Sequence, residues 1–279
     1  MKLMRILSTI LVLVLSLTLT SIAQEQSEAD LAKKTQNPIS DLISVPFQNN
    51  FDFNMGPHDR TRYTLNIQPV IPFNITENWN LITRTIVPVR YQPDVTENSG
   101  GEFGLGDINT SWWLSPSKPG KIVWGIGPIL QLRTATDDTL GTGKWAAGPS
   151  LVVLTTPGKW VVGFLANNIW SFAGDSDRED VNFFTFQYFV NYNLPNGWYL
   201  VSAPINTADW EADSSDRWTV PLGGGAGKVV RLGILPINVQ TQAFYNVEHP
   251  EFGPEWQLRF QLQFLFPKTT KKMHELSAN

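Results

Sequence analysis

Hydrophobic and polar residues alternate almost without interruption along the stretch Trp256–Phe266 near the C-terminus. Only a β-strand places successive residues on opposite faces, so this period of two predicts a strand. A large apolar face opposite long polar side chains is typical of a sheet between lipid and water. A soluble sheet with one solvated face gives the same alternation, so the rest of the chain has to distinguish the two. The apolar face comprises Trp256, Leu258, Phe260, Leu262, Phe264 and Phe266, and the polar face comprises Gln257, Arg259, Gln261 and Gln263.

Comparable alternating segments recur along the chain from about residue 43 onward. They are bounded by residues that favour turns, and their length suits tilted membrane strands of about 9 to 11 residues plus extensions better than a soluble sheet. We therefore predict an all-β fold, a transmembrane antiparallel outer-membrane β-barrel of about twelve strands. The predicted strands are residues 43–53, 62–73, 78–92, 103–114, 121–133, 144–155, 160–172, 181–192, 197–208, 217–227, 236–245 and 255–266.

The connections between these strands alternate in length, which is typical of a barrel with tight periplasmic turns and longer outer loops. An even number of strands then places both ends of the barrel on the periplasmic side. The short connections are residues 74–77, 115–120, 156–158 and 193–196, and the longer polar loops are residues 93–102, 134–143, 174–180, 209–216 and 246–254.

Ten tryptophans fall near the predicted strand ends rather than in the middle of the strands. Amphipathic indole rings settle at the two membrane interfaces, so this distribution predicts two aromatic belts. Trp198 and Trp210 are out of phase with their neighbours and are candidates to point inward. The predicted interface residues are Trp79, Trp113, Trp124, Trp160 and Trp198 at the short-turn ends, and Trp145, Trp170, Trp210, Trp218 and Trp256 at the long-loop ends.

The N-terminus carries the features of an export signal. Lys2 and Arg5 precede an apolar run that ends at Ser21-Ile22-Ala23, whose small residues match a signal-peptidase site. A single spanning helix is the less favoured alternative, because polar residues follow this site at once. The chain thus divides into a signal peptide (1–23), a periplasmic lead-in with a short helix (24–41), the barrel (42–267) and a C-terminal tail (268–279).

The composition and charge of the chain limit the cofactors and partners it can have. The chain has no cysteine, so disulfides and thiolate metal sites are excluded, and nothing indicates a cofactor or a metal. Loss of Lys2 and Arg5 with the signal peptide lowers the formal charge from −4 to −6, which argues against a nucleic-acid partner. The expected partners are outer-membrane lipid, lipopolysaccharide and a small-molecule solute.

Five blocks of sequence carry a resemblance to a known family: residues 79–84 (WNLITR), 102–107 (EFGLGD), 140–145 (LGTGKW), 191–199 (NYNLPNGWY) and 217–225 (RWTVPLGGG). Together they resemble the bacterial outer-membrane barrel family named after the phenol-degradation (MetA) pathway, whose members are labelled transporters. The resemblance covers about Asp41 to Lys268 and implies an outer-membrane barrel with a transport function. It brings no binding residues with it, and the extension after Phe266 departs from barrels that stop at a terminal aromatic residue.

Three other features could indicate nucleotide binding, calcium binding or catalysis, but each has a structural explanation that fits better. The glycine-rich residues 221–229 lack the first glycine and the final serine or threonine of a phosphate-binding loop, and fit a strand bend or bulge. The acidic residues 175–180 lack the spacing of a calcium-binding loop and fit a solvated charge run. A membrane hydrolase needs a nucleophile beside a base, whereas His58, His249 and His274 all lie outside the predicted strands. We therefore predict that the protein is not an enzyme.

Several of the predicted strands carry charged residues on their polar face, and we expect these residues to face the lumen. An arginine that faced lipid near the midplane would cost about 2 to 4 kcal/mol, so the inward orientation is strongly preferred. Arginine is in excess, so these residues either constrict the pore, select small anionic or hydrogen-bond-accepting solutes, or only brace the wall. The lumen candidates are Asp52, Arg62, Arg90, Asp107, Arg133 and Arg259 in the outer half, and Arg84 deeper.

The function expected from these features is an outer-membrane channel or transporter for small solutes. Twelve strands lie between eight, where side chains fill the interior, and the 16 to 18 of open porins, so a narrow and partly occluded path is expected. Aromatic compounds are suggested only by the family's name. A closed structural or surface barrel is the main alternative, and an outer-membrane hydrolase is a further one.

Overall fold

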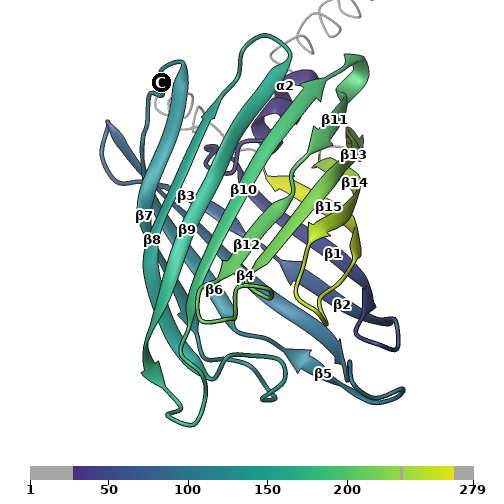
Figure 1. Ribbon diagram of the computed structural model, residues 1–279. Helices are drawn as coiled ribbons and strands as arrows, with labels where there is room; N and C mark the ends of the chain where they lie inside the picture. Colours follow the sequence, from purple (N-terminus) through teal and green to yellow (C-terminus); the bar gives the residue numbers. More distant parts are fainter. Residues whose placement is uncertain (1–27, 233–234, 267–279) are drawn as a thin grey trace, which may run out of the picture.

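The computed structural model describes residues 28–232 and 235–266, which form a closed antiparallel β-barrel (Figure 1). The strands run from Ile43 to Phe266, and fifteen strand segments belong to one sheet within the described residues. The predicted signal peptide and the whole of the predicted C-terminal tail lie outside the described residues. The prediction of an all-β outer-membrane barrel of twelve strands is confirmed.

The barrel closes where β1 (Ile43–Met55) pairs with β15 (Trp256–Phe266), in register from Ile43 opposite Phe266 to Phe53 opposite Trp256. The segments between them pair mainly with their neighbours in the chain. They are β2 (Arg60–Ile67), β3 (Val70–Asn74), β4 (Trp79–Pro93), β5 (Gly101–Leu105), β6 (Ile108–Pro116), β7 (Ile122–Leu132), β8 (Lys144–Thr155), β9 (Trp160–Gly174), β10 (Asn182–Asn193), β11 (Trp198–Ser202), β12 (Ile205–Asp209), β13 (Trp218–Leu232) and β14 (Leu235–Glu248).

Three of the twelve barrel strands are each interrupted once. The pairs β2 and β3, β5 and β6, and β11 and β12 each continue one predicted strand across a gap of two residues. Pro69 and Pro204 lie in two of these gaps, and proline cannot donate to the hydrogen-bond ladder. Two strands clearly exceed their predicted length: β13 continues to Leu232 instead of ending at residue 227, and β14 continues to Glu248 instead of ending at residue 245.

The outer surface of the barrel is apolar. On β15 every residue of the predicted apolar face is exposed or half-buried, and the buried residues Arg259, Gln263 and Leu265 all lie on the opposite face. Large hydrophobic side chains are similarly exposed around the wall, among them Phe73, Leu114 and Leu200. Such a surface suits lipid, whereas a soluble monomer rarely exposes large apolar patches.

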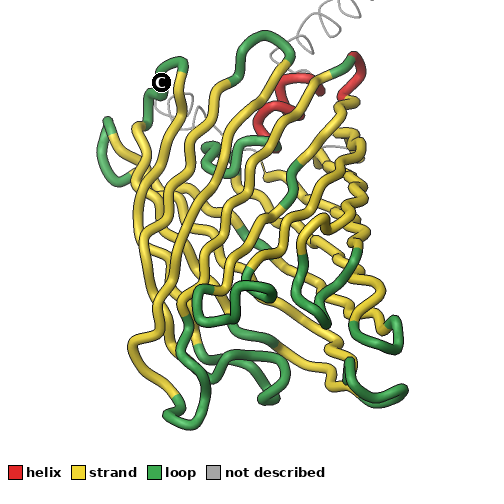
Figure 2. Tube along the Cα trace, viewed as in Figure 1, coloured by secondary structure: helices red, strands yellow, loops and turns green. Residues whose placement is uncertain are grey.

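The two ends of the barrel differ in their connections (Figure 2). The turn end carries short links such as residues 75–78 and 156–159, and the loop end carries longer ones such as residues 133–143 and 175–181. The link between β1 and β2 at the loop end is the exception, a tight turn with positive φ at Gly56 and Asp59. Short turns are periplasmic in bacterial outer-membrane barrels, so the loop end faces outward.

A helix closes the turn end of the barrel. This helix, α2 (Glu28–Thr35), confirms the short helix expected in the lead-in, and a single 3-10 turn, η1 (Pro195–Gly197), lies beside it. The helix lies within the mouth of the barrel in contact with β10, β11, β13 and β14 (Figure 1). In the described part of the chain no helix is long and apolar enough to cross a membrane.

The two faces of the wall can be tested with neighbouring residues on β2, Leu65 facing out and Asn66 lining an internal cavity. We expect Leu65→Arg to lower the free energy of unfolding by about 2 to 4 kcal/mol, because it places a charge in lipid near the midplane. Asn66→Arg adds the same charge to a polar cavity and is expected to cost much less. Urea unfolding in lipid vesicles measures both, and equal losses would contradict the assignment of faces.

Candidate functional site

Polar side chains line the inside of the barrel near the strand that closes it. On β1 the inward residues Ser44, Gln48, Asn50 and Asp52 are buried, while the outward residues between them are only partly covered. Buried polar groups are tolerated only where they are hydrogen-bonded. These residues therefore have to bond to one another or to neighbouring strands.

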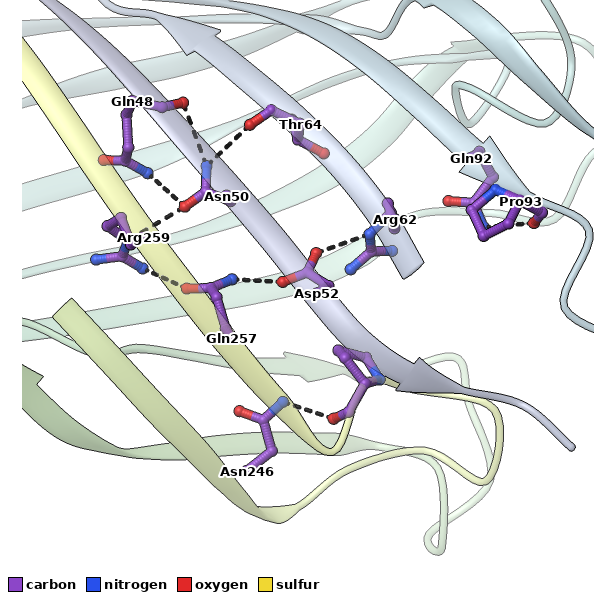
Figure 3. Close-up of polar contacts among 11 residues, drawn as sticks. Gln48, Asn50, Asp52, Arg62, Thr64, Gln92, Pro93, Asn246, Gln257 and Arg259 are labelled. Atoms are coloured by element: carbon purple, nitrogen blue, oxygen red, sulfur yellow. Dashed lines mark hydrogen bonds and ion pairs between the residues drawn. The ribbon is translucent and has the colours of Figure 1, made fainter. Parts of the chain in front are cut away.

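Asp52 is the centre of the resulting network (Figure 3). Its Oδ2 accepts a hydrogen bond from Arg62 Nε at 2.9 Å, which is also an ion pair, and its Oδ1 accepts one from Gln257 Nε2 at 2.6 Å. Asp52 and Arg62 lie opposite each other on β1 and β2, and Gln257 lies opposite Asp52 on β15. The carboxylate thus joins three adjacent strands across the seam of the barrel.

Arg259 extends this network into the lumen and is almost completely buried. Its Nε donates to Asn50 Oδ1 at 3.2 Å, and one terminal nitrogen donates to Gln257 Oε1 at 3.0 Å. The other donates to the backbone carbonyl oxygen of Ala203 at 2.9 Å. Because Ala203 belongs to the gap between β11 and β12, this bond passes over two intervening strands and narrows the lumen.

The Ala203 carbonyl oxygen is fixed from a second side. Gln187 Nε2 on β10 donates to it at 3.3 Å, and Ala203 N donates to Gln242 Oε1 on β14 at 3.0 Å. The break at Ala203–Pro204 therefore brings backbone into the lumen instead of only interrupting a strand. Pro204 within the predicted strand 197–208 was the sequence signal for this break. The inward position of the Ala203 carbonyl oxygen was not predicted.

A loop-end cavity of about 400 Å³ lies on the outer side of this narrowing. Its lining includes Asp52, Arg62 and Arg259 from the network, and also Arg90 of β4. Arg90 Nε is buried and has no hydrogen-bond partner in the described structure. The other side of the cavity is lined by Phe183 and Ile205 together with the threonines Thr207 and Thr219.

A smaller turn-side cavity of about 140 Å³ lies between the narrowing and the helix. Amide side chains dominate its lining, among them Gln187, Asn238 and Gln261. Arg84 also lines it, and its guanidinium donates to Gln68 Oε1 at 2.6 Å. The lumen therefore has two polar compartments with one predicted arginine, Arg84, in the deeper one.

An apolar cluster fills the lumen at the turn end. Leu31 and Ala32 of α2 and Ile39 after it are buried against inward side chains of the wall, including Val161 and Val229. One pair of directional hydrogen bonds also holds the segment, because the Gln36 and Asn193 side-chain amides donate to each other's oxygens at 3.0 and 3.1 Å. The lead-in, predicted as a periplasmic segment without further role, is thus a plug in the barrel mouth.

Trp113 belongs to this cluster, so its predicted interface position is wrong. Its side chain is fully buried and its Nε1 donates to Ser150 Oγ at 2.9 Å inside the barrel. Trp112 takes the exposed position on β6 instead. The physical reason is that α2 supplies an apolar surface inside the lumen, where one of two adjacent tryptophans can be buried.

The remaining predicted interface tryptophans lie near the two rims of the barrel, exposed or half-buried. Several contact another aromatic ring, as Trp79 does with Trp124 at a centroid distance of 5.9 Å. Trp198 and Trp210, the candidates to point inward, are both exposed. The others in this group are Trp145, Trp160, Trp170, Trp218 and Trp256.

Asp107 anchors a loop instead of lining the pore with an unpaired charge. Its Oδ1 accepts hydrogen bonds from the backbone N–H groups of Thr134 and Ala135, and its Oδ2 accepts from Thr142 N and Oγ1. Four bonds to one carboxylate hold both ends of the loop 133–143 against the gap between β5 and β6.

Arg133 lies at the outer mouth of the barrel, in the loop after β7, and lines neither of the two lumen cavities. Strand β7 ends at Leu132, one residue earlier than predicted, so Arg133 belongs to the loop. Its side chain is 44% exposed and pairs with Asp175 at 3.6 Å. Arg178 also links these two loops, donating to the carbonyl oxygens of Asp138 and Gly141.

The acidic residues 175–180 take part in these contacts at the outer mouth. Lys144 Nζ contacts Asp180 Oδ1 at 3.1 Å. That hydrogen bond and a second from Ser171 hold the pKa of Asp180 below its ordinary value. Within residues 28–232 and 235–266 no group of three or more histidine or acidic side chains is close enough to hold a metal ion.

Comparison with known proteins extends the fold assignment. No protein-family profile and no curated protein matches the chain. Among solved structures, an outer-membrane channel from Pseudomonas putida F1 matches with a TM-score of 0.62 and 17% identity, over 81% of this chain and 94% of that one. At this identity the similarity shows the fold, an outer-membrane β-barrel.

Two further solved structures match less closely. The CymD monoaromatic hydrocarbon channel has a TM-score of 0.46 and 8% identity, over 88% of this chain and 92% of that one. Outer membrane phospholipase A from Escherichia coli has a TM-score of 0.43 and 11% identity, over 86% and 98%. The relation to the phenol-degradation family stays a prediction.

The anchoring role of Asp107 predicts a change in protease sensitivity. Asp107→Ala removes the carboxylate that accepts all four hydrogen bonds, and hydrogen bonds to a charged group are worth about 1.5 to 3 kcal/mol each. We expect trypsin to cleave after the exposed Arg133 at least about ten-fold faster in the variant. Asp137→Ala is the control, because Asp137 bonds only to Thr139 within the loop. Equal cleavage rates in the two variants would contradict the anchor.

Proposed function

We propose that this protein is an outer-membrane channel that passes small solutes through the lumen of its barrel, and that the N-terminal segment is its closure. The observation that carries the proposal is the arrangement along the barrel axis. A polar inner wall encloses two cavities, and the segment that closes the turn end is not part of the sheet.

The closure can leave without damage to the wall. Residues 28–39 make no strand pairing, and their described contacts with the wall are the apolar packing of Leu31, Ala32 and Ile39 and the amide pair between Gln36 and Asn193. Apolar packing is non-directional and the wall keeps its own hydrogen bonds. Displacement of residues 28–39 therefore joins the turn-side cavity to the periplasm.

The narrowing at Arg259 limits the size of the solute that can pass. Its hydrogen bond to the Ala203 carbonyl oxygen separates the two cavities. One long side chain can change rotamer on a short timescale, whereas the backbone break at Ala203–Pro204 is fixed by Gln187 and Gln242. Small solutes are therefore the class that such a path supports.

A channel similar in fold supports this proposal. The Pseudomonas putida protein is an outer-membrane channel, and it shares the barrel architecture over most of both chains. Outer-membrane lipid and lipopolysaccharide are the proposed surroundings of the apolar wall and the acidic loops.

The alternative of an outer-membrane hydrolase receives less support. His58 lies exposed in the turn between β1 and β2, and His249 Nδ1 contacts the carbonyl oxygen of Pro250. Neither ring contacts a serine or threonine hydroxyl in the described structure. A nucleophile with a positioned base, which hydrolysis requires, is therefore not formed by these two residues.

Removal of the plug tests the proposed function. In planar bilayers we expect a variant lacking residues 28–39 to conduct several-fold more current than the parent, because the turn-side cavity then opens into the periplasmic solution. Liposome swelling with small neutral and anionic solutes measures the same change as flux. No conductance and no flux in either protein would favour a closed structural barrel.

A second pair of variants controls for indirect effects of the deletion. The chain has no cysteine, so Gln36→Cys with Asn193→Cys introduces the only thiols. A short bismaleimide that joins the two thiols is expected to hold the plug in place. The crosslinked double variant should then conduct less than the parent. Each single cysteine variant treated in the same way should conduct like the parent.

A further inference from the structure

The loop-end cavity has an excess of positive charge on one side. Four charged side chains line it, Asp52, Arg62, Arg90 and Arg259, so three guanidinium groups face one carboxylate. Asp52 is already paired with Arg62, and Arg259 donates from all three of its nitrogens to Asn50, Gln257 and Ala203. A charge inside the barrel wall is screened less than one in bulk water, so this excess of positive charge favours an anion.

Arg90 is the guanidinium that remains available. Its Nε is buried without a hydrogen-bond partner, and in the described structure no side chain or backbone group accepts a hydrogen bond from it. It lies opposite Thr64 of β2, so Arg62, two residues away on the same face, is its diagonal neighbour. An unsatisfied guanidinium donor is costly, and a carboxylate can accept from it through two parallel hydrogen bonds.

The wall across from Arg90 carries apolar side chains beside two threonines, Thr207 and Thr219. Phe183 of β10, Ile205 of β12 and Pro221 of β13 line the same cavity. Phe183 also packs against a second apolar cluster inside the barrel, formed by Ile129, Ala146 and Ile169. The cavity is therefore amphipathic across its width, with guanidinium groups on β2 and β4 and the apolar side chains of Phe183 and Ile205 on β10 and β12.

We infer that this cavity binds a small monocarboxylate with an apolar body, with the carboxylate on Arg90 and Arg62 and the body against Phe183 and Ile205. A volume of about 400 Å³ is within the usual range of small-molecule sites. The inference rests on the proposed channel function, because it names the class of solute that the lumen would select. It differs from general anion selectivity, since the apolar wall makes the body of the solute part of the recognition.

Binding can be measured without transport. The affinities of three ligands for the folded protein in detergent can be compared by isothermal titration. Benzoate has both the carboxylate and the apolar ring, acetate lacks the ring, and benzyl alcohol lacks the charge. We expect benzoate to bind at least about ten-fold more tightly than either, because only benzoate uses both walls. Binding of benzoate no tighter than that of acetate and benzyl alcohol would overturn the inference.

Variants assign the binding to the named residues. Arg90→Gln is expected to weaken benzoate binding about ten-fold or more, and Arg90→Lys to restore part of it. Phe183→Ala should weaken benzoate and leave acetate unchanged. Arg60→Gln is the matched control, because Arg60 loses the same charge at the rim, where it donates to the carbonyl oxygens of Glu97 and Gly100. Unchanged benzoate affinity in folded Arg90→Gln would overturn the inference.

Flux measurements separate this inference from the channel function. Benzoate flux through reconstituted protein without saturable binding would overturn the carboxylate site and leave the channel intact. Saturable benzoate binding without any solute flux would support the site and count against the channel.

Discussion

Closure of the sheet at β1 and β15 is the constraint on which the rest of the structure depends. In lipid no water can satisfy an open strand edge, so a spanning sheet must return to its first strand. The eleven-residue register from Ile43 opposite Phe266 to Phe53 opposite Trp256 meets this requirement. Stacked Phe53 and Trp256 rings, 4.3 Å apart, stabilise the outside of the same seam. Inside, Asp52 and Arg259 bond across it. The charged network of the lumen therefore lies on the strands that close the barrel.

The period of two that produces the apolar exterior also determines the polar interior. Each lipid-facing residue on β1 is followed by one that faces the lumen. The inner face of the wall is therefore formed by a second set of residues, whose polarity is independent of the apolar outer face. The chain uses that face in two ways. Amides and arginines cover it near the seam, and aliphatic side chains cover it near the turn end, where α2 packs. This division separates a polar compartment that can hold a solute from an apolar one that can hold a plug.

Most of the wall could be predicted from the sequence, because alternation is a local property and survives in each strand separately. The inward positions of Asp52, Arg62, Arg90 and Arg259 follow from the same argument. Features that depend on contacts between distant segments could not be predicted. Trp113 reverses its expected face because α2 packs in the same apolar cluster, and Arg133 pairs with Asp175 of another loop because β7 ends at Leu132. The inward carbonyl oxygen of Ala203 needed knowledge of Gln187 and Arg259, which approach it from strands far along the chain.

The two closures of the lumen differ in the kind of interaction that holds them. The narrowing is built from directional hydrogen bonds, since the Ala203 carbonyl oxygen accepts from two sides and Asp52 fixes the strands from which Arg259 extends. Directional bonds hold one geometry and recover it after disturbance. The plug is held by apolar contacts of Leu31 and Ile39 and one amide pair, and such contacts permit displacement without leaving strand groups unpaired. A filter must keep its shape and a gate must move. The loop-end network therefore suits selection of the solute, and the turn-end helix suits control of its release.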